Sequence, residues 1–386
     1  MDFALNHTQK MLIDTVRRFI AEELKPLEAS VDAENALAPE TARAIFEKSK
    51  SLGLYALNMP DEFGGGGLSA VDTMLCEEQF GHTSDILIRR AFGDVFDALL
   101  ACKGEQIDRW LKPVVSGERV CALAITEPSA GSDARAVKTR ARRTDSGWVL
   151  NGSKHFISDA ECSDCFVVLA RTGEKELSLF LVDKALPGFT LGKNQEMMGL
   201  RGTTHNELFF DDVPLEPVAL LGEQGDGFKI IADLLGRVRL AFIGARAVGK
   251  AAQVLEMMTE YANDRKQFGK SIGEFQMIQQ MLADSVIEIN SARLMVLHTA
   301  WMMDNGLDAR DWISMVKVQS SEMLGRVVDR GVQVFGGSGF CKDLAIERYY
   351  RDARIFRIFD GTSEIHRMSL AKSLLRNGAP LYDIHR

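Results

Sequence analysis

The sequence has little cysteine, no excess of positive charge and no long hydrophobic run. Six cysteines are scattered over 386 residues, which favours reduced thiols over a disulfide framework. Cys162 and Cys165 form one CxxC, but no second ligand pair follows at the spacing of a structural zinc site. We interpret this pair as incidental. The net charge of -8 argues against a protein that binds the nucleic-acid backbone.

Membrane and secretion signals are also missing. Apolar runs such as 165–170 and 240–245 are far too short to span a bilayer. The first residues, MDFALNHTQKMLIDTVRRF, lack the apolar core and small-residue cleavage site of a signal peptide. We therefore expect a soluble, cytoplasmic protein without a membrane or nucleic-acid partner.

Several catalytic and cofactor motifs are absent as well. The seven histidines are dispersed, and no zinc-protease motif, nucleophile elbow or kinase signature occurs, so we predict no metal site. The glycine run at 64–67 lacks the Lys-Ser/Thr of a phosphate loop, and FGGSGF at 335–340 follows a helical pattern rather than a strand. We interpret the first as a loop and the second as a helix end.

What the sequence does contain is a change of hydrophobic period. A helical period dominates the first third, alternation with short strands replaces it near residue 118, and a helical period returns after Pro217. A length of 386 residues indicates two or three domains. We predict an α+β multidomain protein with an N-terminal helical domain (1–117), a central antiparallel β-sandwich or barrel (118–222) and a C-terminal helical bundle (223–386).

The individual elements follow from the same patterns. The predicted helices of the first part are 8–24, 41–52, 70–80 and 92–111. The predicted strands are 119–125, 137–144, 147–150, 153–158, 165–171, 177–182, 189–191 and 206–210, and Asn151-Gly152 is a strong hairpin signal between two of them. The predicted apolar stripes of the bundle are Val248, Ala252, Leu255, Met258 and Ala262; Phe275, Ile278, Met281, Leu282, Val286 and Ile289; and Met315, Val318, Met323, Val327 and Val334.

Two stretches could carry chemistry. In 348–375, two apolar-periodic segments meet at an acidic turn, Asp360-Gly361. One interpretation is an ordinary turn in which Asp360, Thr362 or Ser363 caps the last helix. The other is a general base, a carboxylate whose pKa rises in apolar surroundings. The second stretch, CALAITEPSAGSD at 121–133, is a strand end rich in small residues and hydroxyls that could approach a ligand closely, or an ordinary turn.

Six motifs in this order closely resemble the acyl-CoA dehydrogenases, and the resemblance runs almost end to end. They are TEPSAGSD at 126–133, NGSKHFIS at 151–158, MGLRGTTHNELFFDDVPL at 198–215, DRKQFGKSIGEFQ at 264–276, QVFGGSGF at 333–340 and RDARIFRIFDGTSEIHR at 351–367. The resemblance implies a helical domain, a β domain and a C-terminal four-helix bundle. It also implies FAD as cofactor, a homotetramer, an acyl-CoA substrate and an electron-transferring flavoprotein as acceptor.

The same resemblance implies roles for individual residues. Ser132 and Gly361 would contact the substrate, and Arg265 and its neighbours would hold the FAD pyrophosphate and adenosine across a subunit boundary, for which the planar fork of an arginine is suited. The implied cofactor contacts are Leu123, Ala124, Ile125, Thr126, Gly131, Ser132, Phe156, Ile157, Ser158, Arg265, Phe268, Gln276, Gln333, Val334, Gly336, Gly337, Thr362 and Glu364.

Four positions depart from the family pattern. Phe156 and Ser158 occupy its Trp-x-Thr positions; the Phe ring can still stack on a flavin but lacks the indole N–H, and Ser keeps a hydroxyl for flavin N5. Glu364 replaces a Gln. Asp360 stands where the family most often has its catalytic Glu, and the helix that supplies the Glu in a subset of members, here 234–249, contains no acid. Asp360 is therefore the predicted catalytic base.

The resemblance implies that Asp360 removes the α-proton of a thioester while the β-hydrogen leaves as hydride to flavin N5. Its backbone N–H and a flavin ribityl hydroxyl would stabilise the thioester oxygen. Members acting on alicyclic acyl groups can carry Asp here, so a branched or cyclic acyl group fits. Two alternatives stay open: an oxidase like the nitroalkane oxidases, which use an Asp base, and a flavin- or CoA-binding homologue without catalysis, in which Asp360 only caps a helix.

Overall fold

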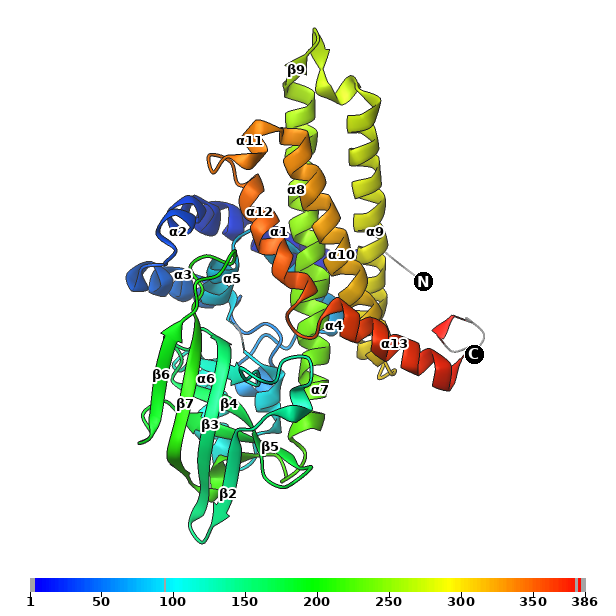
Figure 1. The fold of residues 1–386 in the computed structure, drawn as a ribbon. Helices are drawn as coiled ribbons and strands as arrows, with labels where there is room; N and C mark the ends of the chain where they lie inside the picture. The colour runs from blue at the N-terminus through cyan, green and yellow to red at the C-terminus, as the bar shows by residue number, and fades with distance from the viewer. Residues whose placement is uncertain (1–3, 94, 379–380, 383–386) are drawn as a thin grey trace.

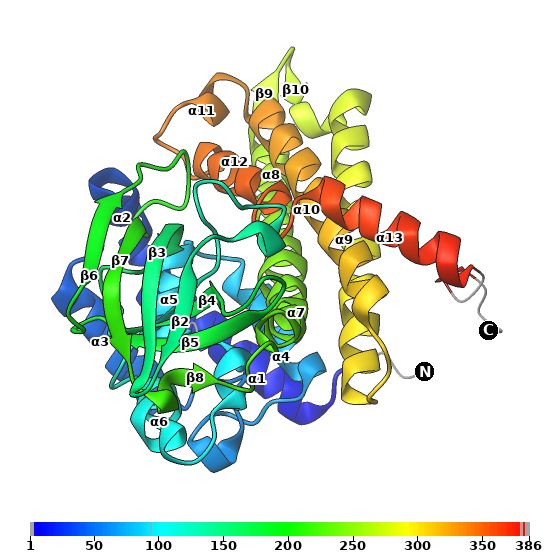
Figure 2. The same cartoon turned by 60° about the horizontal axis from the view of Figure 1, so that its bottom comes forward.

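The computed structural model describes residues 4–93, 95–378 and 381–382. Helices form the first part, a twisted sheet the middle part and long helices the last part, and the sheet packs beside both sets of helices (Figures 1 and 2). The predicted order of a helical domain, a β domain and a helical bundle is confirmed. The residue boundaries given above for the three domains stay a prediction.

The N-terminal helices pack around an apolar core that includes Val16, Leu24, Ile86 and Leu87. The first helix begins with a capping box, in which the Asn6 side chain accepts a hydrogen bond from the backbone N–H of Gln9 and the Gln9 side chain accepts one from the backbone N–H of Asn6. The helices are α1 (His7–Phe19), α2 (Glu28–Glu34), α3 (Pro39–Ser51), α4 (Ala70–Phe80), α5 (Asp85–Phe92) and α6 (Lys112–Val115).

The predicted helix 92–111 is wrong. α5 ends at Phe92, and only two short helical turns follow, Asp97–Ala101 and Ile107–Leu111. Gly93 and Gly104 adopt left-handed φ values of 80° and 54°, which end a right-handed helix. Leu99, Trp110 and Leu111 still point into one core. Their spacing therefore resembles that of one helix, although the helix is interrupted after Phe92.

The central part is an eight-stranded sheet in the order β6-β7-β3-β2-β4-β5-β8, with β1 paired to β4. Most neighbours are antiparallel, as predicted, but β1 runs parallel to β4, and β2 meets β4 in parallel at one position. The strands are β1 (Cys121–Ala124), β2 (Arg140–Thr144), β3 (Gly147–Ser158), β4 (Cys165–Arg171), β5 (Leu177–Asp183), β6 (Phe189–Asn194), β7 (His205–Leu215) and β8 (Leu220–Leu221).

The Asn-Gly hairpin prediction is wrong, because β3 runs straight through Asn151-Gly152. The hairpin is formed by β2 and β3, and its turn lies at 145–146, where Thr144 pairs with Gly147. Gly152 has φ 140°, and a Cβ there would lie 2.6 Å from the Cα of Thr139. The register against β7 shifts at this point, so the glycine serves a bulge and a close backbone approach rather than a turn.

The C-terminal part is built on one nearly continuous helix formed by α7 (Gly227–Val238), a π-helical segment η8 (Arg239–Ala245) and α8 (Arg246–Asp264). It packs with α9 (Gln276–Asp304) and α10 (Arg310–Phe335), and a two-stranded hairpin of β9 (Lys266–Gln267) and β10 (Lys270–Ser271) joins α8 to α9. The remaining helices are α11 (Gly337–Phe340), α12 (Ile346–Ala353), the 3-10 turn η10 (Arg354–Arg357) and α13 (Ser363–Asn377).

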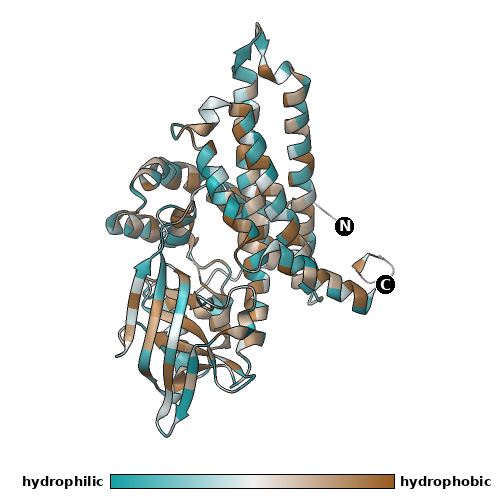
Figure 3. Cartoon of the chain, viewed as in Figure 1, coloured by the Kyte–Doolittle hydropathy of each residue, from teal (hydrophilic) through white to brown (hydrophobic). Residues whose placement is uncertain are grey.

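The predicted bundle stripes are confirmed in part. Val248, Met258, Ile289 and Val327 are among the buried core residues. Val286 on α9 is exposed. On α10 the predicted Met323 is buried, but Met315 and Val318 are only half-buried, because the helix turns Val316 and Leu324 inward instead. Hydrophobic and hydrophilic bands alternate along the bundle helices in Figure 3, and none of the helices in the described ranges is both long and apolar enough to cross a membrane.

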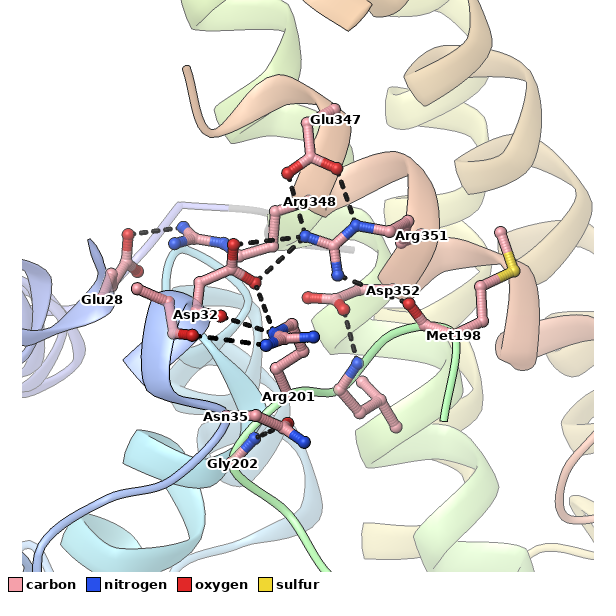
Figure 4. Close-up of polar contacts among 12 residues, drawn as sticks. Glu28, Asp32, Asn35, Met198, Arg201, Gly202, Glu347, Arg348, Arg351 and Asp352 are labelled. Carbon is pink, nitrogen blue, oxygen red and sulfur yellow. Dashed lines mark hydrogen bonds and ion pairs between the residues drawn. The ribbon is translucent and has the colours of Figure 1, made fainter. Parts of the chain in front are cut away.

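An ion-pair network joins the three parts of the chain (Figure 4). Arg348 on α12 pairs with Glu28 on α2 at 2.6 Å, and Arg351 pairs with Asp32 at 3.0 Å. The buried carboxylate of Asp352 accepts a hydrogen bond of 2.6 Å from the backbone N–H of Leu200, in the loop before β7. The N-terminal helices, the sheet loop and α12 are thereby held in one fixed arrangement.

Close helix packing gives a first prediction. A Cβ at Gly249 would lie 1.8 Å from the carbonyl oxygen of Glu78, whereas a Cβ at Gly325 would meet nothing within 4 Å. We expect Gly249→Ala to lose about 1–3 kcal/mol of unfolding free energy, because α4 and α8 must move apart. Gly325→Ala is the matched control and should gain up to about 1 kcal/mol. Thermal unfolding of both variants, followed by circular dichroism, tests this; equal midpoints would contradict it.

Buried histidines give a second prediction. Burial lowers the pKa of His82, His205 and His366 to about 4, so these rings are neutral in the folded chain at pH 5.5 and charged after unfolding. Stability therefore falls as pH decreases from about 6.5 toward 4. Unfolding by urea in weakly buffered solution at pH 5.5 should take up about one proton fewer in His205→Gln than in the unchanged chain. An identical uptake would show that His205 titrates normally in the fold.

Candidate active site

The turn between η10 and α13 carries Asp360 in a left-handed conformation with φ 53°, followed by Gly361 with φ 91°. Thr362 is the N-cap of α13, and its hydroxyl accepts a hydrogen bond of 3.2 Å from the N–H of Ile365. Of the three caps considered from the sequence, the structure therefore selects Thr362. Asp360 is half-buried and lies two residues before the cap, so capping does not account for its carboxylate.

Two side chains from other parts of the bundle hold the backbone of Asp360. Nε of Arg239, the first residue of η8, donates to the Asp360 carbonyl over 2.7 Å, and Nε2 of His366 lies 3.3 Å from the same oxygen. Nδ1 of His366 lies 3.1 Å from the Ser314 hydroxyl. The carbonyl can only accept, so Nε2 carries the proton and Nδ1 accepts from Ser314. Burial, aided by the charge of Arg239, lowers the pKa of His366 to about 4 and keeps this tautomer neutral.

The first predicted cofactor group, 123–126, lies at the end of β1 and is held by β3. The N–H of His155 donates to the carbonyl of Thr126 over 2.8 Å, and the Lys154 ammonium donates to the carbonyl of Ile125 over 2.9 Å. Gly131 and Ser132, further along the same loop, are exposed. Loop and strand therefore form one rigid unit with accessible small residues.

A buried ion pair under this loop was not found from the sequence. Lys154 is fully buried and lies 2.9 Å from the Glu127 carboxylate, which also accepts the backbone N–H groups of Lys138 and Thr139. Burial lowers the pKa of Lys154 to about 8. Burial alone would raise the pKa of Glu127, but Lys154 and the N–H donors lower it overall. The sequence did contain a signal for this ion pair, because Lys154 occupies an inward-facing position of the predicted strand 153–158.

Phe156 lies at a bulge in β3. The register against β7 shifts between Lys154 and Ile157, and Phe156 adopts φ 59° with 49% of its surface exposed. A left-handed φ is unusual for an aromatic residue and costs about 1–3 kcal/mol. The bulge turns this ring outward, whereas Ile157 points into the sheet core and Ser158 is half-buried. The end of β3 therefore offers the exposed aromatic ring of Phe156 and, two residues on, the hydroxyl of Ser158.

The second predicted cofactor group lies at the far end of the bundle, around the β9–β10 hairpin and α11, away from the sheet (Figure 1). Stacking of Tyr261 on Phe335, with ring centres 4.2 Å apart, ties the ends of α8 and α10 together there. Phe268 is 94% exposed. The members of this group are Arg265, Phe268, Gln276, Gln333, Val334, Gly336 and Gly337.

The predicted site is therefore brought together only in part. In both views the turn that leads into α13, which carries Asp360 and Gly361, lies beside the loops at the edge of the β domain (Figures 1 and 2). The second group is separate within one chain. The side chains of Ala124, Ile157 and Val334 are buried, so these three offer a ligand only their backbone.

Backbone strain coincides with the predicted functional positions. Eight non-glycine residues of the described ranges have a left-handed φ, and three of them are Phe156, Phe268 and Asp360. Such conformations persist only where surrounding contacts enforce them, and they concentrate at functional sites. Arg239 and His366 hold the carbonyl of Asp360 but were not predicted from the sequence, because no local pattern indicates that these two side chains turn toward that carbonyl.

A cavity of about 440 Å³ lies elsewhere, between α3, α5 and the start of β1. It shares only Ser158 with the predicted residues. Arg90 in its wall pairs with Asp159 at 2.7 Å and Arg119 with Asp183 at 2.6 Å. Its charges are compensated by protein groups, so we assign no ligand to it.

Three family models match almost the whole chain. They are the acyl-CoA dehydrogenase N-terminal domain over 6–118, the middle domain over 122–213 and the C-terminal domain over 225–375.

Individual relatives agree with these matches. The chain is 36% identical to the mitochondrial short-chain specific acyl-CoA dehydrogenase of Homo sapiens, covering 97% of this chain and 91% of that protein. It is 35% identical to acryloyl-CoA reductase (NADH) of Anaerotignum propionicum, covering 97% and 96%. The solved FAD complex of PigA superposes with a TM-score of 0.89 at 29% identity, covering 98% and 100%. The chain therefore belongs to the acyl-CoA dehydrogenase family of flavoprotein oxidoreductases, which act on CH–CH groups.

Proposed function

We propose that the chain is an FAD-dependent dehydrogenase that forms an α,β-double bond in an acyl-CoA thioester, with Asp360 as the base. The observation that carries the proposal is the anchored turn. Asp360 is a half-buried acid whose backbone carbonyl is fixed by Arg239 and His366, two residues of other helices. Catalytic groups must be held within a fraction of an ångström of their working position, and an anchored turn achieves this.

The predicted cofactor residues of the β domain, 123–126, 131–132 and 156–158, fit a flavin. The outward ring of Phe156 offers a face for stacking, and the hydroxyls of Thr126 and Ser158 can donate to ring nitrogens and oxygens. Exposed Gly131 lets a ligand approach the backbone without a Cβ clash. When bound, the flavin supplies the acceptor for the β-hydrogen of the substrate.

The chain's own part in the reaction is proton transfer and orientation. The Asp360 carboxylate takes the α-proton, and Ser132 and Gly361 line the position of the thioester. The backbone N–H of Asp360 is proposed to stabilise the charge that develops on the thioester oxygen, a contribution of about 3 kcal/mol for one such donor. Neutral His366 and charged Arg239 keep this N–H in place, because both hold the carbonyl of the same residue.

A second copy of the chain would complete the cofactor site. Arg265 and Phe268 are exposed, and the β9–β10 hairpin beside them lies far from strand β3, which carries Phe156. This separation agrees with a pyrophosphate and adenosine held across a subunit boundary. Large apolar residues are exposed on α9 and α13, as expected of a surface covered in an oligomer: Met277, Ile287, Leu294, Trp301 and Leu375. We propose a homotetramer that passes electrons to an electron-transferring flavoprotein.

The main test is removal of the base. We expect Asp360→Asn to bind FAD and acyl-CoA but to lose at least about a hundredfold in the rate of flavin reduction, which is the lower range for a general base. Anaerobic bleaching of the yellow protein by a panel of acyl-CoAs measures this rate. Asp329→Asn, which removes an exposed carboxylate of α10, is the control and should be unchanged.

Each other outcome favours a named alternative. Unchanged bleaching in Asp360→Asn would remove Asp360 as the base. Bleaching by nitroalkanes with rapid hydrogen peroxide formation, and indifference to thioesters, would favour an oxidase. No bleaching of the unchanged chain by any of these compounds would favour a binding homologue.

The length of the acid predicts substrate preference. Asp is one methylene shorter than Glu, a deficit of about 1.5 Å, and a misplacement of about 1 Å can cost a hundredfold in rate. We propose that branched or alicyclic acyl groups bring their α-carbon closer to Asp360. Asp360→Glu should therefore shift the ratio of bleaching rates toward straight-chain substrates. Bleaching of the unchanged chain by straight-chain thioesters alone would contradict this preference.

A further inference from the structure

α10 presents a polar face to the turn that carries Asp360. Ser314, Lys317 and Ser321 are spaced by three and four residues, which places them on one side of the helix. Ser314 contacts His366 at 3.1 Å, and the Ser321 hydroxyl lies 3.4 Å from that of Ser363. Lys317 lies between these two contacts along the helix, so it faces the segment 360–366.

The Lys317 ammonium is buried without a hydrogen-bond partner among the described residues. Its side chain is fully buried, and neither Nζ nor the neighbouring Ser320 hydroxyl makes a hydrogen bond there. The other two fully buried lysines differ: Lys154 donates to Ile125 and Glu127, and Lys250 donates to the carbonyl of Thr83. A buried ammonium is stable only when a nearby negative charge compensates for its lost water.

Three carboxylates act on Lys317, and they are not equivalent. Glu322, on the same helix, already pairs with Arg357 at 3.0 Å and Arg367 at 3.2 Å. Glu364, in the first turn of α13, is exposed, and solvent screens it. Asp360 is half-buried, and its charge opposes most strongly the lowering of the Lys317 pKa, to about 8, that burial causes.

Two further groups face Asp360. Arg239 is a second cation, but its Nε is directed at the Asp360 carbonyl. His366 is neutral, because burial and the charge of Arg239 lower its pKa to about 4. Lys317 is thus a cation on the face of α10 that meets the segment 360–366, where the charge of Asp360 acts on it, and its ammonium forms no hydrogen bond in the described structure.

We propose that Lys317 is a positioning residue whose ammonium keeps the Asp360 carboxylate ionised, and so ready to accept a proton, before substrate binds. The inference rests on the proposed role of Asp360 as the base. Desolvation pushes a carboxylate toward its protonated form, which cannot take a proton, and an opposite charge within about 4–6 Å lowers the pKa again by about 1–3 units. Lys317 would therefore decide at how low a pH the enzyme still works.

The test compares Lys317→Met with the unchanged holoenzyme across pH 5 to 9. The midpoint of the acid limb of the bleaching rate should rise by about one unit or more, so that the rate falls about tenfold at low pH and little at pH 9. Lys317→Arg keeps the charge and should restore the original midpoint. Lys250→Met, which removes a fully buried lysine of α8, is the matched control and should leave the midpoint unchanged.

A second measurement needs no turnover. Infrared titration of protein labelled at aspartate carboxyl carbons, with Asp360→Asn providing the difference spectrum, reports protonation of Asp360 directly. The midpoint should rise by the same amount in Lys317→Met. An unchanged midpoint in Lys317→Met by either method would overturn the proposal. Protonation of Asp360 at pH 6 in the unchanged chain would also overturn it, and this result can be obtained even if Lys317→Met does not fold.

The two proposals fail in different ways. If no thioester bleaches the unchanged holoenzyme, the proposed function fails, while the infrared midpoints still measure the coupling of Lys317 to Asp360. If bleaching occurs but Lys317→Met retains the original midpoint, only the inference about Lys317 fails.

Discussion

A guanidinium or ammonium group inside a protein is stable only when carboxylates or carbonyls compensate for the water that it has lost, and the contacts between the parts of this chain follow that requirement. Arg246 of α8 is buried against Glu77 of α4 and lies 3.5 Å from Asp85 of α5. Arg348 reaches Glu28 on α2. Because breaking such a pair leaves a buried charge uncompensated, these contacts fix how the helical domains meet, whatever their net contribution to stability.

The same requirement acts within the candidate site. Lys154 and Glu127 compensate each other beneath the loop that leads from β1, and the ammonium also holds the carbonyl of Ile125. On the bundle side, Arg239 is fixed to the carbonyl of Asp360. Each half of the site is thus carried by a charged side chain that is anchored in its own domain. Each of the two loops is thereby held rigid within its own part of the chain.

One chain nevertheless holds only part of what the resemblance to the family implies. The sheet that carries Phe156 and the turn that carries Asp360 lie toward one end of the bundle, while the β9–β10 hairpin, which carries Phe268, lies at the far end. The bundle is a rigid spacer between the two groups, since α8, α9 and α10 share one apolar core along their length. A second copy is the natural way to bring a distal group to a site, and it would also cover the apolar residues exposed on α9 and α13.

The sequence by itself determined the order of helical, β and helical parts, because hydrophobic period reports which face of an element is buried. The pattern around Asp360 left open whether it is a helix cap or a base, and the resemblance of the motifs to a family made it the predicted base. The sequence did not predict that β3 runs through Asn151-Gly152, where the glycine allows a close approach to Thr139. It also did not predict that the helix ends at Phe92. Only the tertiary structure brought Arg239 of η8 and Lys317 of α10 toward the Asp360 turn and showed that His366 folds back onto its carbonyl. The physical reason is that no local pattern encodes which polar residue of one helix will face another segment.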